Sequence, residues 1–239
     1  MKKLTLTLSL FFLLTNVFAQ KIELSVQTSA ALLHFAGTST TSQTIINTGA
    51  TPYTNNPYGK EAGLGYSLGL QAQYIAKGGF IAGVQTGFDR LRSKVDITGV
   101  TPQYYLDYNF NYAPFPAKGE TYLTTQDINL SPYLGYRFII KRVKLDLMPG
   151  LDLGFNLSLY DRGSAKTTGD QTTYKTNYRE PNAPTDVRLK LSLAAMYNRF
   201  GVTASYAHGV TNYESNIIGD NSYQAHSELF RFGVSYRIN

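Results

Sequence analysis

The sequence predicts an all-β protein, an eight-stranded antiparallel up-and-down transmembrane β-barrel. Three observations indicate this fold class. Segments in which apolar residues take every second position recur along the chain, and the connections between them alternate between short and long. The remaining positions of these segments hold charged residues, polar residues or glycine. After the N-terminal segment, no stretch reaches about 18 consecutive apolar residues, so a membrane-spanning helix is not expected.

The first element, residues 1–19, is expected to be a secretory signal peptide, and residues 20–239 a single barrel domain. Two lysines precede an apolar run that ends at Phe18, and small residues stand at the usual positions before a cleavage site ahead of Gln20. The run is too short for a membrane-spanning helix. Because the chain contains no cysteine, an exported form cannot depend on disulfides or thiolate metal sites.

Eight strands are expected to follow in chain order. Long connections, rich in Thr, Asn, Gly, Pro and Tyr, are expected at roughly 35–61, 94–120, 161–183 and 212–223. In an up-and-down meander alternate connections share one end, so these long loops lie together on one rim. The expected strands are 22–34, 62–76, 80–93, 121–140, 143–160, 184–197, 200–211 and 224–238.

The numbering of the apolar residues tests the three tight turns. Apolar positions are even up to Ile140 and odd from Val143, as a two-residue hairpin loop requires. The turn at Asn198 and Arg199 should change the parity again, whereas the three-residue turn at 77–79 should preserve it. Both do.

The polar wall of the strands is predicted to face inward. It alternates charged side chains with glycines, and glycine weakens a strand without benefit on a solvent-facing surface. In the narrow interior of an eight-stranded barrel, however, small residues make room for long neighbours. The apolar wall then faces lipid, where only a helix or a closed barrel pairs every backbone group. Side chains fill such an interior, so a diffusion pore is not expected.

The predicted register implies one contact in the lumen. Pairing residue 140 with residue 143 places Arg137 directly opposite Asp146, with both side chains pointing inward. An unpaired charge in a tight interior is costly, so we expect these two residues to form an ion pair within a larger network.

Two prolines interrupt the predicted strands. Pro132 and Pro149 cannot donate a ladder hydrogen bond, and each lies in a strand with neighbours on both sides. We expect β-bulges at both prolines, and a bulge would shift the register beyond it by one residue.

The sequence indicates no catalytic, metal or cofactor site. A barrel deacylase acting on lipid A needs a histidine, a serine and a carboxylate within reach of one another. No nucleophile stands beside His208, whose parity places it on the lipid side, and His34 and His226 stand singly without metal-ligand spacing. A lipid A-modifying barrel enzyme remains the alternative function. A third reading, a periplasmic ligand-binding barrel of the lipocalin type, requires the apolar wall to face inward.

The second long loop is the candidate partner-binding loop. Aromatic side chains with polar tips are enriched at protein interfaces. Alternatively, this segment extends the neighbouring strands and reaches the lipid headgroups. The aromatic residues are Tyr104, Tyr105, Tyr108, Phe110 and Tyr112.

The other long loops differ in charge. The third contains Arg162, Lys166, Lys175 and Arg179, which could meet lipopolysaccharide phosphates or form a mixed-charge solvated loop. The first loop has almost no charge and is expected to be flexible.

Several features together resemble a known family. These are the eight-strand layout, the cleavage site before Gln20, and the stretches 206–212 (YAHGVTN) and 233–238 (GVSYRI). They are similar to the outer-membrane β-barrel domain family common in Bacteroidota, which includes PorT-like proteins. Most members of that family have no defined activity.

The C-terminal strand also resembles the recognition signal of outer-membrane proteins. Arg231, Gly233, Tyr236 and Ile238 match it, whereas Asn239 replaces the typical terminal phenylalanine. The resemblance implies assembly by the outer-membrane insertion machinery. We therefore expect a non-catalytic structural or interaction role, with outer-membrane lipid, lipopolysaccharide and other envelope proteins as partners. The basic excess is spread along the chain, so nucleic acid is not an expected partner.

Overall fold

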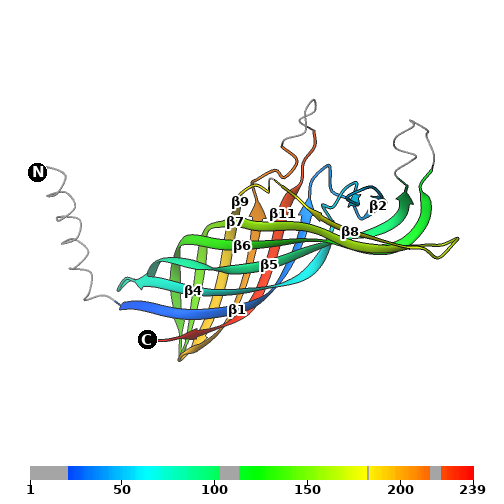
Figure 1. Ribbon diagram of the computed structural model, residues 1–239. Helices are drawn as coiled ribbons and strands as arrows, with labels where there is room; N and C mark the ends of the chain where they lie inside the picture. Colours follow the sequence, from blue (N-terminus) through cyan, green and yellow to red (C-terminus); the bar gives the residue numbers. More distant parts are fainter. Residues whose placement is uncertain (1–20, 103–112, 182, 216–221) are drawn as a thin grey trace, which may run out of the picture.

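A computed structural model describes residues 21–102, 113–181, 183–215 and 222–239. Eight strands form a closed antiparallel ring in the order β5-β4-β1-β11-β10-β9-β7-β6, and β6 pairs back with β5 (Figure 1). The predicted eight-stranded up-and-down barrel is confirmed. The ring strands are β1 (Lys21–Ala36), β4 (Glu61–Ile75), β5 (Phe80–Thr101), β6 (Phe115–Ile140), β7 (Val143–Thr167), β9 (Asp186–Tyr197), β10 (Phe200–Gly209) and β11 (His226–Arg237).

Three strands were not expected from the sequence, because they lie in segments predicted to be loops. They are β2 (Gln43–Asn47), β3 (Tyr53–Thr54) and β8 (Thr173–Arg179). β2 pairs in parallel with the far end of β5, and β8 pairs with the far end of β7. Threonine-rich segments form strands here because the long ring strands offer them a free edge.

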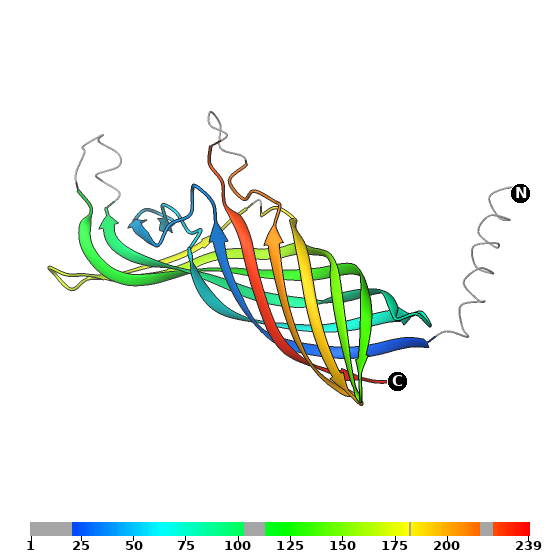
Figure 2. The same cartoon turned by 180° about the vertical axis from the view of Figure 1, so that it is seen from behind.

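The middle strands of the ring extend well beyond the barrel. β5, β6 and β7 contain 22, 26 and 25 residues, whereas a membrane crossing needs only about 9–11. Their excess length lies at the end of the barrel that carries the long connections, and together with β2 and β8 it forms a projecting sheet (Figure 2). The C-terminus lies at the opposite end, with the tight turns (Figure 2).

The side-chain orientation of the barrel is the one predicted. Apolar side chains are exposed around the outside, and acidic and basic side chains are buried within. Leu191 and Leu193 of β9 are exposed, for example, whereas Arg188 of the same strand is fully buried. No helix in the described ranges is long and apolar enough to cross a bilayer. Because apolar side chains cover the outside of the closed ring of strands, the barrel is the membrane-spanning part of the molecule.

Aromatic residues mark two levels on the apolar wall. At the end with the tight turns, Phe200 packs against Tyr236 with ring centroids 5.1 Å apart. At the other end, Tyr206 packs against Phe230 at 4.7 Å. Tyr66 and Tyr74 mark the same two levels on β4, and eight residues of strand span about 26 Å, or about 20 Å along the axis of a tilted strand. These levels match the two interfaces of a membrane.

The prediction of bulges at Pro132 and Pro149 was wrong. Leu130 pairs with Leu153 and Arg137 with Asp146 in one unbroken register, so no residue is inserted at either proline. Each proline removes one donor from the ladder between β6 and β7 without shifting it. The register shift between these strands lies instead at Gln126 and Asp127, near the outer end of the barrel.

The orientation of the wall predicts how a charge should act at different depths. Leu191→Arg places a cation at the middle of the apolar belt and should lower the free energy of unfolding by about 2–4 kcal/mol. Ile140→Arg, at the tight-turn end, should cost about 0–1 kcal/mol. The two leucine-sized residues are exposed to similar extents, 48% and 58%. Denaturant titration in lipid vesicles measures both values, and equal penalties would contradict the assigned membrane position.

Candidate functional site

The lower part of the lumen contains an ion cluster that joins four strands. Arg137 Nε and Nη2 each donate to Asp146 at 2.6 Å, and Nη1 and Nη2 donate to Glu23 at 3.1 and 2.9 Å. Arg237 Nη1 donates to the same Glu23 at 2.7 Å. The structure thus brings together Arg137 and Asp146, and it adds Glu23 from the first strand and Arg237 from the last. This cluster ties the closing seam between β1 and β11 to β6 and β7.

A second ion cluster crosses the middle of the lumen. Asp152 accepts hydrogen bonds from Arg188 Nη1 and Arg231 Nη1, each at 3.0 Å, and from Ser131 at 2.6 Å. Arg231 Nη2 also donates to Asp89 at 2.6 Å. The four charged residues come from β5, β7, β9 and β11, so their side chains fill the barrel from wall to wall. A cavity of about 60 Å³ beside this cluster has room for only a few water molecules.

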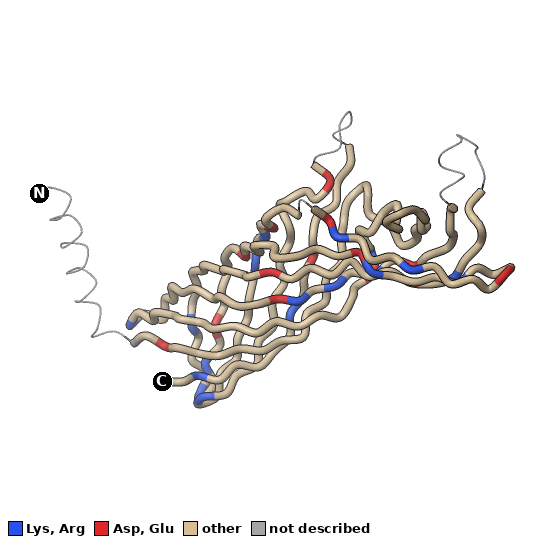
Figure 3. Tube along the Cα trace, in the orientation of Figure 1, with Lys and Arg blue, Asp and Glu red and all other residues tan. Residues whose placement is uncertain are grey.

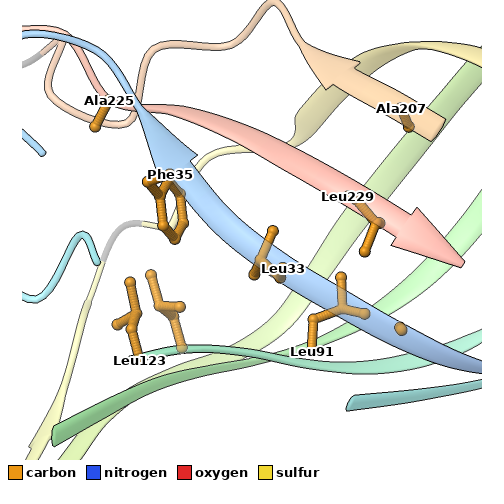
Figure 4. Close-up of a cluster of buried hydrophobic side chains, with 9 residues drawn as sticks. Leu33, Phe35, Leu91, Leu123, Ala207, Ala225 and Leu229 are labelled. Carbon is orange, nitrogen blue, oxygen red and sulfur yellow. The ribbon is translucent and has the colours of Figure 1, made fainter. Parts of the chain in front are cut away.

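The outer mouth of the lumen is apolar, which the alternation of polar residues did not predict. Leu33, Leu91 and Leu229 point into the barrel and are buried together (Figure 4). Phe35 lies above them, with its ring in edge contact with Tyr58 at 5.2 Å and Tyr213 at 5.1 Å. This apolar layer and the two ion clusters close the lumen at three levels.

The rim of the barrel joins two histidines through one carboxylate. Glu228 on β11 lies between its register partners His34 on β1 and His208 on β10. The distances from its carboxylate oxygens are 3.1 Å to His34 Nε2 and 3.5 Å to His208 Nδ1. The expectation that His34 stands singly was therefore wrong. The sequence held no signal for this cluster, because it depends on the register between the first and last strands.

The projecting sheet has one covered face. Thr54 donates from its backbone N at 3.1 Å and from Oγ1 at 2.7 Å to Asp161 of β7. Ile46 of β2 packs in a buried apolar cluster with Ile97 and Val100 of β5. The first long loop, which we expected to be flexible, contains β2 and β3: β2 pairs with the edge of β5, and Ile46 and Thr54 lie over the inner face of the sheet.

The cations of the third long loop lie on strands rather than in a solvated loop. Arg162 and Lys166 belong to β7, and Lys175 and Arg179 to β8, all exposed on the uncovered face of the projecting sheet. The register places Arg162 opposite Asn177, and Arg162 Nε donates to Asn177 Oδ1 at 3.0 Å.

Acidic residues near the projecting sheet differ in their surroundings. Burial, together with the nearby charges of Asp161 and Glu214, raises the pKa of Glu180. A hydrogen bond from Lys94 instead lowers the pKa of Glu120, and the same contact raises the pKa of Lys94. Across the described residues, no group of three or more His, Cys, Asp or Glu has an arrangement suited to a metal ion.

The predicted partner-binding loop lies outside the described residues. The residues concerned are Tyr104, Tyr105, Tyr108, Phe110 and Tyr112. The strands on either side, β5 and β6, end at Thr101 and begin at Phe115, at the tip of the projecting sheet (Figure 1). The segment is therefore attached at the far end of the extended strands.

Comparisons with known proteins gave matches among solved structures alone. No protein-family model matches the chain, and no curated protein matches it in sequence. Among solved structures, Ail of Yersinia pestis in complex with the heparin analogue sucrose octasulfate is 13% identical, with a TM-score of 0.37, over 91% of this chain and 99% of that chain. Neisserial surface protein A is 14% identical, with a TM-score of 0.34, over 91% and 99%.

A third similar structure is the translocator domain of the autotransporter NalP from Neisseria meningitidis. It is 11% identical, with a TM-score of 0.33, over 91% of this chain and 88% of that chain. At these identities and TM-scores the similarity bears on neither ligand nor partner. The apolar belt and the closed ring of strands are themselves the architecture of outer-membrane proteins.

The central ion cluster predicts a large effect from removing one charge. Asp152→Asn keeps the shape of the side chain but leaves Arg188 and Arg231 without a shared counter-charge. Because Arg188 keeps Asp186 and Arg231 keeps Asp89, the free energy of unfolding should fall by about 1.5–3 kcal/mol, the contribution of a buried charged hydrogen bond. Glu61→Gln, which removes an exposed partner of Lys94, should change it by less than about 1 kcal/mol. Urea titration in vesicles compares the two, and a small effect of Asp152→Asn would show that the cluster is not a stabilising crosslink.

Proposed function

We propose that the protein is a non-catalytic outer-membrane barrel that acts through its surface beyond the membrane. The observation that carries the proposal is the contrast between the two ends of the molecule. The lumen is closed by two ion clusters and an apolar layer. The extended strands β5, β6 and β7 instead build a projecting sheet well outside the membrane. A structural or contact role, alone or as a subunit of an envelope complex, fits this division.

The rim histidines favour a non-catalytic role over a lipid A-modifying enzyme. A hydrolytic site requires a nucleophile hydrogen-bonded to the base. In the described part of the chain, both His34 and His208 contact Glu228, and no serine or threonine hydroxyl is hydrogen-bonded to either ring. The cluster has a base and a carboxylate without the group that would attack an ester.

Sequence features near the two ends of the chain support the proposed export and assembly. Residues 1–19 have the composition of a signal peptide. The C-terminal strand resembles the recognition signal of outer-membrane proteins except at Asn239, and its Tyr236 and Ile238 are exposed on the apolar wall. The outer-membrane insertion machinery is the proposed transient partner, and lipid and lipopolysaccharide are the permanent surroundings.

The aromatic segment at the tip of the projecting sheet is the proposed contact point for other envelope proteins. Its tyrosines combine large apolar area with a polar hydroxyl, which suits a protein interface. The strands that flank it, β5 and β6, belong to the sheet that projects beyond the barrel, which supports a contact with a neighbouring protein.

The closed lumen predicts the electrical behaviour of the protein. Purified protein in a planar lipid bilayer should give no stepwise conductance under conditions in which a general porin does. Phe35→Ala opens only the apolar layer, so this variant should also stay closed because both ion clusters remain below it. Discrete channel openings by the unaltered protein would overturn the closed-barrel proposal.

The aromatic segment predicts a selective loss of contacts. Replacing Tyr104, Tyr105, Tyr108, Phe110 and Tyr112 by serine should abolish chemical crosslinking to neighbouring envelope proteins in intact cells. Membrane insertion should be unchanged, which the heat-dependent shift in gel migration of folded barrels reports. A matched variant with Thr38, Thr40 and Thr41 replaced by serine controls for loop substitution in general. If every crosslink survives the aromatic replacement, the segment is not the contact point.

A further inference from the structure

The open face of the projecting sheet is a direct continuation of the lipid-facing wall. Tyr66 of that wall pairs with Arg90, and the outward positions of β5 then continue at Arg92 and Lys94. On β7, the register shift near Asn156 changes the parity, so that Tyr160, Arg162 and the following even-numbered residues face outward. The same face therefore changes from apolar to polar where the membrane ends.

This face carries a strong excess of positive charge, and the charges follow the projecting strands (Figure 3). Eight basic residues on four strands face outward there, against the acidic residues Asp96 and Glu120 and the neighbouring Glu61 of β4. The basic residues are Arg90, Arg92, Lys94, Lys118, Arg162, Lys166, Lys175 and Arg179. The inner face of the projecting sheet is not open in this way, because β2 and β3 cover it.

All three acidic residues are engaged by a single lysine. Lys94 Nζ lies 3.2 Å from Glu61, 3.2 Å from Asp96 and 3.0 Å from Glu120. Within the described ranges, none of the other seven basic residues makes an ion pair with a carboxylate. Their positive charge is therefore available to an anion from outside the chain.

Some of these cations lie so close together that a bound anion would reduce the repulsion between them. Lys118 of β6 lies directly opposite Lys166 of β7 in the register, and like charges in that position are destabilising. A shallow groove of about 840 Å³ lies over them and is also lined by Arg162, Lys175 and Asn177. Lysine and arginine side chains around one groove are the groups that bind phosphate in proteins.

Aromatic rings hold the guanidinium groups of this face in place. The Arg162 guanidinium lies 4.3 Å from the centroid of the Tyr160 ring, and the Arg179 guanidinium lies 6.0 Å from the same centroid. Arg92 lies 6.0 Å from the centroid of Tyr122. Stacked guanidinium groups lose less freedom when they bind an oxyanion, because their orientation is already restricted.

We infer that this basic face binds the phosphate groups of the glycolipid in the outer leaflet around the barrel. The inference rests on the proposed outer-membrane role and names the ligand of its outer surface. The position of the face favours phosphate groups of membrane lipid over soluble phosphate. The face begins at the end of the apolar belt, so the residues nearest the membrane lie at the level of the headgroups. Positive side chains near an anionic membrane surface add favourable binding, residue by residue.

The test compares lipopolysaccharide binding by the full-length protein and a charge-reversed variant. Native mass spectrometry in detergent measures the affinity for lipopolysaccharide and for the same lipid after removal of its phosphates. The protein should bind the phosphorylated form at least about tenfold more tightly, and Arg162→Glu with Lys166→Glu and Lys175→Glu should remove that preference. The control variant Lys77→Glu with Lys141→Glu and Arg142→Glu reverses three cations at the opposite end and should retain it.

Three further measurements make the outcome decisive. The milder pair Lys166→Gln with Lys175→Gln should weaken binding at least about threefold, so the result does not depend on one variant folding. Inorganic phosphate at the same phosphate concentration should not compete, and efficient competition would identify a site for soluble anions instead. Equal binding of both lipid forms, or unchanged binding by the charge-reversed variant, would overturn the inference. The absence of channel conductance is measured separately, so failure of the closed-barrel proposal would be recognised independently.

Discussion

The constraint on which the structure depends is that a backbone in lipid must have all of its hydrogen bonds within the protein. A sheet meets this condition only when its first and last strands pair, and β1 and β11 do so along twelve residue pairs from Ser25–Arg237 to Ala36–His226. Closure in turn fixes which face of every strand meets lipid. The space inside the ring is so narrow that charged side chains there must form ion pairs with one another.

The charges inside the barrel are consequently crosslinks rather than a solvated channel lining. Glu23 and Arg237 join the two ends of the chain, and Asp89, Asp152 and Arg231 join strands on opposite sides of the ring. Glycines on the same wall are the complement of these long side chains. At Gly154, for example, an added Cβ would lie 3.4 Å from Arg188 Nη2, in contact with the guanidinium group. Outside the membrane the same strands are free of these limits, and there they carry an open, strongly basic face.

Much of the barrel could be predicted from the sequence because the pairing of strands joined by a tight turn depends on residues close together in the chain. Parity on either side of the turn at Lys141 and Arg142 fixed the pairing of β6 with β7, and hence placed Arg137 opposite Asp146. The register between β1 and β11 is set by no turn, so the cluster of His34, His208 and Glu228 could not be predicted. The apolar layer at the mouth was missed for a related reason, since its members come from distant strands.

The extra strands were missed because turn-rich composition was taken as evidence for loops. β2 forms because the far end of β5 offers a free edge with which it can pair. That edge exists because β5 is 22 residues long, whereas the sequence predicted a strand that ends at residue 93. The prolines show the opposite error. A β-bulge was predicted at Pro132 and at Pro149, whereas the hydrogen bonds of the neighbouring residues are sufficient to maintain the register of the strands.

The pairing of the first strand with the last also means that the barrel cannot close without both of them. No intermediate that lacks β11 can complete the ring, so every partly synthesised chain has two bare strand edges. Contacts between residues more than two hundred positions apart, such as the hydrogen bond from Arg237 to Glu23, need both of these strands in place. A truncation that removes only the C-terminal twelve residues would therefore leave no smaller stable barrel, only a sheet that must find an edge on another molecule.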